Sequence, residues 1–286
     1  MIIDAHCHAG KGDLMTAPWN TDAPLAAYLR RARAAGIDKT VVMAAFHTDN
    51  VQANQQVARI VGRHPTRLIG FVFVHAKRDA GRIFGMVKHA VTRWGFRGIK
   101  VHGYEAMPTR EICETARALA LPVLVDVASR AEVVDMFAPQ YPDVNFIIAH
   151  LGSFTDSWRA HQQVIYQLRR YPNVYADTSG VRQFDYLMQA IRVAGARKLI
   201  FGSDGPWLHP GLELHKIRLL GLDPNDEALV LGGNVARLLH SAGRGVKHHR
   251  TTAMLTRKHS HGTDDGVSSL GEFHSELLES ESQYKL

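Results

Sequence analysis

Cysteine is almost absent from this chain of 286 residues. Cys7 and Cys113 are the only two, which is too few for a disulfide framework, and they lack the paired spacing of a structural zinc site. We therefore expect two reduced thiols. Hydrophobic residues make up 45% of the chain, which is ample for the core of one large domain.

Long apolar runs are missing as well. No stretch reaches the roughly 18 apolar residues that a membrane span requires. The first residues, Met1 to His8, pass directly into a strand-like pattern, without the charged start and apolar stretch of a secretory signal. We expect a soluble, cytoplasmic protein with no membrane partner. Glycine (24) and proline (11) are near average usage, which argues against a fibrous or disordered chain.

The chain also lacks a tract of one charge. Lys and Arg number 34 against 27 Asp and Glu, a formal net charge of +7, but the basic residues are scattered. This pattern favours a solvated surface and no nucleic-acid partner. Alternatively, the excess positive charge attracts an anionic small-molecule substrate such as a carboxylate, because clefts concentrate the electric field. The oligomeric state stays open, with a homodimer as one option.

Eight short aliphatic or β-branched runs alternate with longer helical patterns. Strands covered by helices read as continuous runs, as Val41 to Ala45 does, which indicates a parallel sheet. Eight strand-and-helix units in about 240 residues predict an α/β fold of the (β/α)₈ TIM-barrel type, because the alternative, a doubly wound open sheet, usually stops at about five to seven strands. The expected strands are Ile2–Ala5, Thr40–Ala45, Leu68–Val74, Gly98–His102, Pro122–Val127, Val144–Ala149, Asn173–Asp177 and Lys198–Ser203.

Helical patterns with apolar residues at three-and-four spacing separate the strands. From residue 244 the periodicity fades and Ser, His, Glu and Lys dominate, which predicts a disordered tail at 244–286 after a barrel domain at 1–243. Metal capture by the histidines of the tail is the alternative, although they lack regular spacing. The expected helices are Leu25–Ala35, Val51–Arg63, Ala80–Trp94, Arg110–Ala120, Ala131–Phe137, Trp158–Tyr171, Gln183–Ala194 and Asp226–His240.

Two histidines lie in the first strand, which reads IIDAHCH from Ile2 to His8. Strand alternation predicts that Asp4, His6 and His8 share one face. Two imidazoles at i and i+2 on a strand end are well placed to bind one cation, such as zinc, through their ring nitrogens. The alternative is a pair of histidines without a common ligand.

Two further polar side chains come at the carboxyl ends of strands, where barrel enzymes place catalytic groups. Asp204 follows the last expected strand and His150 the sixth. Because the eighth strand of a closed barrel neighbours the first, Asp204 can meet the first-strand histidines. A carboxylate, a water and histidines around a metal can activate a nucleophile. A helix cap or a turn residue is the alternative for Asp204.

Five motifs carry a resemblance to a known family. They are DAHCH, GIKVHG, AHLGS, FGSDGPW and LGGNVARLL, in the family's order, and the likeness spans about residues 1 to 242. The chain resembles the amidohydrolase superfamily, specifically the amidohydrolase-related branch, which includes metal-dependent hydrolases and decarboxylases similar to aminocarboxymuconate semialdehyde decarboxylase. The resemblance implies a barrel of the metallo-dependent hydrolase type.

The resemblance also implies roles for the polar side chains. His6 and His8 would be metal ligands, and Asp204 a ligand that also takes the proton of the attacking water. His150 would polarise the scissile group or act as acid or base. The implied cofactor is a divalent metal, zinc or alternatively manganese.

One strand end departs from the family pattern. The fifth strand of the family normally ends in a metal-binding histidine, whereas PVLV is followed here by Asp126. We interpret Asp126 as an oxygen ligand, which zinc or manganese accepts. Weakened metal affinity is the alternative.

Substrate-binding residues are expected on the fourth strand and in the last two strand-to-helix loops. Lys100 and His102 share an inward face, and we assign Lys100 to a substrate carboxylate, with a buried ion pair as the alternative. Arg182 and Trp207 lie in the last two loops, where substrate selectivity usually resides.

The leading functional hypothesis is a metal-dependent hydrolase that uses a metal-activated water on an ester, lactone or amide of a small carboxylated substrate. The metal and His150 would stabilise the oxyanion. The first alternative is a non-oxidative decarboxylase of an unsaturated or aromatic acid, although the compact barrel, without long insertions, favours hydrolysis. A catalytically inactive barrel that only binds a partner is the second alternative, suggested by Asp126 alone.

Overall fold

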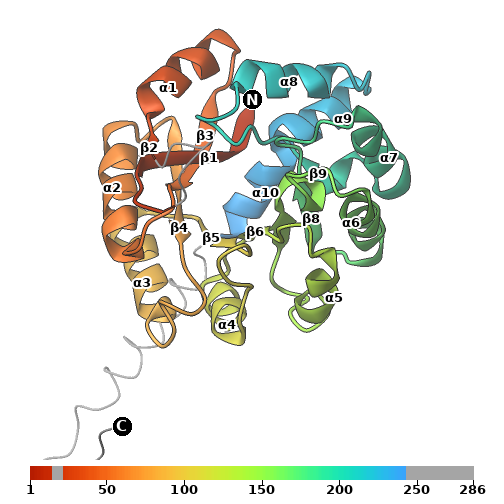
Figure 1. Ribbon diagram of the computed structural model, residues 1–286. Helices are drawn as coiled ribbons and strands as arrows, with labels where there is room; N and C mark the ends of the chain where they lie inside the picture. Colours follow the sequence, from red (N-terminus) through yellow and green to blue (C-terminus); the bar gives the residue numbers. More distant parts are fainter. Residues whose placement is uncertain (15–21, 243–286) are drawn as a thin grey trace, which may run out of the picture. The chain divides into compact units, whose positions relative to one another are not determined.

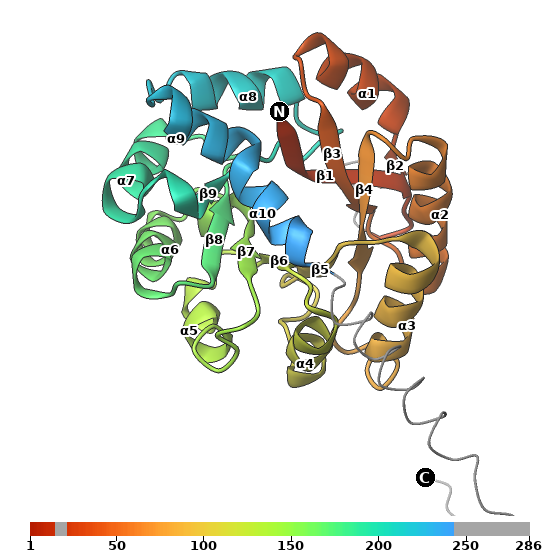
Figure 2. The same cartoon turned by 180° about the vertical axis from the view of Figure 1, so that it is seen from behind.

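The computed structural model describes residues 1–14 and 22–242. In this part of the chain, eight parallel strands form a barrel with helices around it, as Figures 1 and 2 show from opposite sides. The predicted (β/α)₈ fold is confirmed. The barrel strands are β1 (Ile3–Lys11), β3 (Lys39–Ala44), β4 (Leu68–Phe73), β5 (Gly98–His102), β6 (Val123–Asp126), β7 (Phe146–Ile148), β8 (Val174–Asp177) and β9 (Leu199–Ile200). A further two-residue strand, β2 (Asp22–Ala23), pairs antiparallel with the end of β1 and is too short for a sequence pattern to indicate.

Hydrogen bonds between the segment after β9 and the first strand close the barrel. The strands follow one another around the ring in chain order. The carbonyl of Phe201 accepts from the amide of Ala5 at 2.9 Å, and that of Gly205 accepts from the amide of His8 at 2.6 Å. The segment that carries Asp204 therefore lies against β1, as predicted from closure.

Most of the predicted helices are present. The observed helices are α1 (Leu25–Ala34), α2 (Asn50–Arg63), α3 (Ile83–His89), α4 (Arg110–Leu119), α5 (Val134–Phe137), α6 (Trp158–Arg170), α7 (Phe184–Ala194), α8 (Pro210–Arg218), α9 (Pro224–Ala228) and α10 (Asn234–Ser241). Helix α8 was not predicted, because its apolar residues do not form one stripe: Leu214 is buried but Leu212 is exposed. The single helix predicted over Asp226–His240 is divided into α9 and α10 by a π-helical segment, Leu229–Gly233.

Helix length and composition also bear on membrane insertion. Among the helices of the described residues, none combines the length and the apolar composition of a bilayer span. The tail predicted for 244–286 lies outside the described residues. Cys7 and Cys113 are both buried and form no disulfide, as expected.

The inside of the barrel is apolar at its amino end. Side chains of the strands meet there with Val235 and Leu238 of α10, which lies across the centre of the ring in both views (Figures 1 and 2). The strand residues of this cluster are Ile3, Ala5, Val41, Met43, Phe71, Leu124, Ile147, Tyr175 and Ile200. Since α10 covers the amino end, the polar side chains at the carboxyl ends of the strands are left as the accessible part of the interior.

Strand β1 contains a bulge that changes which residues face inward. The register against β3 shifts between Asp4 and Cys7. Ala5 packs in the apolar interior of the barrel, whereas Asp4 accepts a hydrogen bond of 2.6 Å from Tyr28 of α1, outside it. The prediction that Asp4 shares a face with His6 and His8 is therefore wrong, because the extra residue of a bulge reverses the alternation.

Candidate active site

A cavity of about 540 Å³ lies at the carboxyl ends of the barrel strands. Its lining combines polar side chains from strand ends with aromatic side chains from the loops that follow. The lining residues are His6, His8, Phe46, Lys100, His102, Tyr104, Asp126, Ala128, Ser129, His150, Phe154, Thr155, Asp204 and Trp207. All but one of the predicted site residues are therefore brought together in a single cavity.

Three of these side chains converge closely enough to share one cation. Nε2 of His6 lies 3.5 Å from Oδ1 of Asp204, and Nε2 of His8 lies 3.6 Å from the same oxygen. Their donor atoms all lie within 4.8 Å of one another. Two imidazoles and a carboxylate are a donor set that zinc binds in catalytic sites.

Hydrogen bonds at the other ring nitrogens fix both imidazoles in the form that binds a metal. Nδ1 of His8 lies 2.7 Å from the carbonyl oxygen of Ala44, which can only accept. Nδ1 of His6 lies 2.9 Å from Oδ2 of Asp177. The proton of each ring therefore sits on Nδ1 and the lone pair on Nε2, as in many metal sites. The residues present fit a divalent metal.

The electrostatics of the site favour the same protonation states. Burial and the neighbouring Lys100 lower the pKa of His6 to about 3. The same two causes hold the pKa of His8 well below its usual range. Both rings are thus neutral near neutral pH. Burial raises the pKa of Asp204 to about 7, so this carboxyl exchanges its proton close to neutrality.

His150 lies beside His6, with ring centroids 5.0 Å apart, in an unusual backbone conformation. Its φ of 57° is in the left-handed region, which a residue other than glycine keeps only when its surroundings hold it there. The amide of His150 donates to Oδ1 of Asp177 at 3.0 Å, and its Nδ1 lies 2.9 Å from the carbonyl of Ser179. Burial alone would lower the pKa of His150, but the carboxylates of Asp204 and Asp126 raise it.

Asp126 faces the cavity, as its strand parity predicts, yet its oxygens are already engaged. Oδ1 accepts from the amide of Ala128 at 2.7 Å, and Oδ2 lies 3.0 Å from Nε2 of His102. Within the described residues, two sets of three side chains are close enough to share an ion, and neither includes Asp126. The sets are His6, His8 and Asp204, and His6, His150 and Asp177. Each oxygen keeps a further lone pair, so the role of Asp126 as a metal ligand stays a prediction.

The four residues predicted to bind substrate occupy different positions. Lys100 is fully buried, with Nζ 3.0 Å from Nε2 of His6, so it lies among the candidate ligands. His102 and Trp207 form part of the cavity wall, and Trp207 packs against His8. Arg182 pairs with Asp156 at 2.7 Å and is not among the described residues that line the cavity.

Two buried residues that the sequence analysis did not single out complete the site. Asp177 ends β8 and bonds His6, and Ser179 donates to Asp177 at 2.6 Å and lies 2.9 Å from Nδ1 of His150. The alternation of β8, with Tyr175 inside the barrel, places Asp177 inward at a strand end. A carboxylate at the carboxyl end of a strand is the same feature that pointed to Asp204.

A family model for amidohydrolases matches residues 3–240. The chain belongs to the amidohydrolase family. The match includes every barrel strand, which confirms the family suggested by the motifs. No curated protein sequence matches the chain.

Solved structures share the fold of this amidohydrolase at low identity. An amidohydrolase from Burkholderia multivorans with bound zinc is 16% identical, with a TM-score of 0.68, over 84% of this chain and 99% of that one. A dihydroxybenzoic acid decarboxylase from Polaromonas sp. with bound manganese and 2-nitroresorcinol is 18% identical, with a TM-score of 0.60, over 84% and 96%. A probable 2-pyrone-4,6-dicarboxylic acid hydrolase from Acinetobacter baumannii with bound citric acid is 16% identical, with a TM-score of 0.65, over 84% and 99%.

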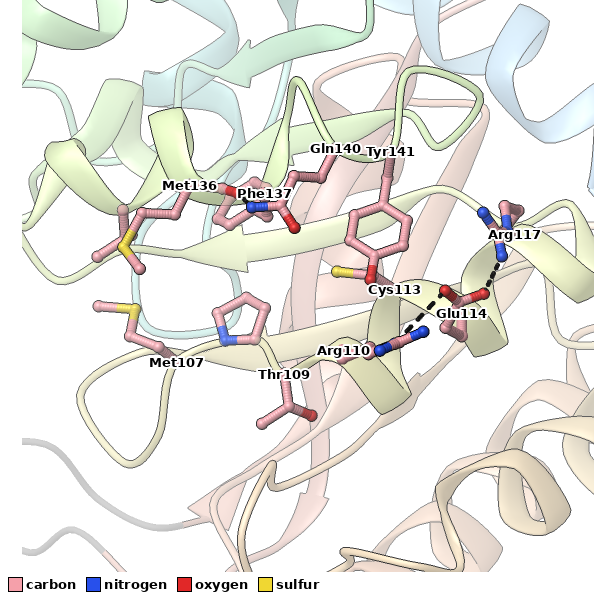
Figure 3. A pocket seen from close by; sticks show the side chains of 12 residues that line it. Met107, Thr109, Arg110, Cys113, Glu114, Arg117, Met136, Phe137, Gln140 and Tyr141 are labelled. Atoms are coloured by element: carbon pink, nitrogen blue, oxygen red, sulfur yellow. Dashed lines mark hydrogen bonds and ion pairs between the residues drawn. The ribbon is translucent and has the colours of Figure 1, made fainter.

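A second cavity of the amidohydrolase, of about 430 Å³, lies between α4 and α5 (Figure 3). Glu114 is the one carboxylate among its described lining residues, and it is paired with Arg110 and Arg117. Burial raises the pKa of the Cys113 thiol to about 12, so this thiol is not a ready nucleophile. The cavity at the strand ends is therefore the candidate active site.

Proposed function

We propose that this amidohydrolase is a metal-dependent hydrolase that cleaves an ester, lactone or amide bond in a small carboxylated substrate. The observation that carries the proposal is the convergence of the Nε2 lone pairs of His6 and His8 on the carboxylate of Asp204. These three residues would hold a divalent cation, zinc or manganese. The zinc and manganese bound to the similar Burkholderia and Polaromonas proteins support this choice.

The cation would supply Lewis-acid chemistry, which polarises a carbonyl oxygen and lowers the pKa of water. The residues of the chain would then handle protons. Asp204 accepts a proton from the attacking water and passes it to the leaving group. His150, whose pKa is raised, donates a hydrogen bond to the oxygen that gains negative charge.

The aromatic walls would orient the substrate. Phe46 and Trp207 are stacked, with ring centroids 6.4 Å apart and planes at 16°, and both border His8. A planar group lying along these rings would displace water from the site, which strengthens the electrostatic interactions inside it.

Decarboxylation of an aromatic acid is the second candidate function. The fold similarity to the Polaromonas decarboxylase favours it, and the same Asp204 and His150 could deliver a proton to carbon. We place hydrolysis first because the barrel is compact, and the similar Acinetobacter protein is a probable hydrolase of a pyrone dicarboxylic acid.

The test begins with protein purified without chelator. We expect about one equivalent of zinc or manganese, and turnover of at least one member of a panel of lactones, aryl esters and amides. Chelation should abolish that turnover and added metal should restore it. Carbon dioxide release from aromatic acids, without hydrolysis, would favour the decarboxylase instead. Protein that holds no metal and turns over nothing would make the chain a binding protein.

Asp204→Asn provides the decisive variant for the active substrate. We expect turnover to fall by about 10² to 10⁴, because an amide of the same size cannot accept the proton of the attacking water. The melting temperature should change little, and Asp185→Asn, at an exposed position of α7, is the control that should keep full turnover. An equal loss of stability and turnover would make Asp204 a structural residue.

A further inference from the structure

Lys100 is a fully buried basic side chain at the centre of the site. It lies on β5, none of its surface is exposed, and its Nζ is 3.0 Å from Nε2 of His6. The ring nitrogen that Lys100 contacts is the one that His6 would present to a metal. Lys100 and a bound metal would therefore compete for the same nitrogen atom.

The chemistry of the two side chains decides the direction of this hydrogen bond. The proton of His6 is on Nδ1, which faces the carboxylate of Asp177 at 2.9 Å. Nε2 therefore carries the only lone pair of the ring, and the amine of Lys100 is the donor. One lone pair can accept from Lys100 or bind a metal, but it cannot do both.

We infer that Lys100 is a built-in competitor of the metal, which takes the lone pair of His6 in the metal-free protein and must withdraw when the metal binds. This inference rests on the metal site of the proposed function and adds a means by which the chain sets its affinity for metal.

Charge balance explains why a cation is needed there. The acidic side chains of Asp126, Asp177 and Asp204 are all buried at the site, and His6 carries a single proton, on Nδ1. Buried carboxylates without a positive partner are costly, and Lys100 supplies positive charge when no metal is present. A divalent cation brings two further positive charges close to the same amine, so Lys100 also opposes it by repulsion.

Withdrawal of Lys100 is sterically feasible. Lysine carries its charge on a flexible four-carbon chain, and Lys100 borders the cavity of about 540 Å³. The competition therefore requires no movement of the barrel strands.

Metal titration of a Lys100→Met variant tests the inference. We expect the variant to bind zinc at least about tenfold more tightly than the wild type in competition with a chromophoric chelator, since both the donor and the positive charge are gone. Its metal-free form should melt at a lower temperature, and zinc should raise the melting temperature more than in the wild type. Lys88→Met, which removes the same charge from an exposed position of α3, should match the wild type in both measurements.

The outcomes separate this inference from the proposed function. Equal or weaker zinc binding by Lys100→Met, with zinc still bound by the wild type, would overturn the competition and leave the proposed metal site standing. Zinc binding by Lys100→Met but not by the wild type would support the competition. It would also contradict the proposal that the wild type functions with a bound metal. Zinc binding by neither protein would overturn both.

A measurement on the wild type keeps the inference testable if Lys100→Met does not fold. We expect crystal structures of the metal-free and the zinc-loaded protein to differ at Lys100, with Nζ at hydrogen-bond distance from Nε2 of His6 only in the metal-free form. An Nζ that keeps this contact in the zinc-loaded form would overturn the inference.

Discussion

A single carboxylate, that of Asp177, holds two histidines of the site in place. Oδ2 lies 2.9 Å from Nδ1 of His6, and Oδ1 accepts from the amide of His150 at 3.0 Å. The side chain is fully buried, which alone would raise its pKa, but the neighbouring His6 and His150 hold the pKa well below the usual range. Asp177 therefore links the candidate metal ligand to the candidate acid at the level of a single residue.

Asp177→Asn should weaken zinc binding by roughly 10-fold to 100-fold, because the amide is a poorer acceptor for His6 and no longer fixes the proton on Nδ1. Competition with a chromophoric chelator measures the change. The exposed Asp185→Asn provides the matched control and should bind zinc like the wild type. Unchanged affinity in Asp177→Asn would remove this residue from the metal site.

The titration of Asp204 sets the pH dependence of metal binding. Burial raises the pKa of Asp204 to about 7, while the pKa of His6 is about 3. Between about pH 5 and pH 7, Asp204 of the metal-free protein therefore carries a proton that the metal must displace. Zinc affinity should rise about tenfold per pH unit over this range and level off above it. Affinity that stays constant from pH 5 to pH 7 would show that Asp204 is not a ligand.

Residue roles were predictable from sequence where a local rule applies. Alternation places Lys100, His102 and Asp126 inward, and all three line the cavity. Alternation fails for Asp4, because the bulge in β1 inserts one residue and no residue type in the strand signals it. The contact of Lys100 with His6 joins two strands that are not neighbours in the sheet, so it follows from barrel closure and not from either segment alone.

At the scale of the elements, strand β5 depends on a glycine at its start. The ring of Phe71 from β4 packs inside the barrel directly over Gly98, and a Cβ at that position would overlap the ring. This glycine therefore allows β4 and β5 to pack together beneath Lys100 and the cavity.

Gly98→Ala should lower the free energy of unfolding by about 1–3 kcal/mol, because the added methyl group overpacks a filled interior. Urea denaturation followed by circular dichroism measures this change. Gly85→Ala in α3 is the control, since a Cβ there meets nothing within 4 Å; it should leave stability unchanged or raise it by about 0.5–1 kcal/mol. Equal stability of the two variants would contradict the packing that we describe.

The number and order of the barrel strands were predictable because short aliphatic or β-branched runs recur along the chain and alternate with helical patterns. Helix α8 was not, since its buried Leu214 and Ile217 share the helix with the exposed Leu212. The division of the last predicted helix was also missed. In the π-helical segment, Gly232 lies so close to the carbonyl oxygen of Met1 that a side chain at this position would overlap that oxygen. This contact joins the two ends of the barrel domain, so local periodicity cannot show it.

At the scale of the whole barrel domain, the two ends of the barrel differ in the side chains that fill them. Helix α10 and the apolar interior fill the amino end, with Val235 and Leu238 packed against the strands. The carboxyl end holds the histidines, the carboxylates and the cavity. This division concentrates the buried charge at one end, where a cation can balance it.

The proposed function depends on one divalent cation bound between His6, His8 and Asp204. Anomalous diffraction at the zinc edge, from crystals of protein loaded with one equivalent of zinc, tests it most directly. We expect a single strong peak about 2.0–2.2 Å from Nε2 of His6, Nε2 of His8 and a carboxylate oxygen of Asp204. A peak away from these three atoms, or no peak inside the barrel, would contradict it.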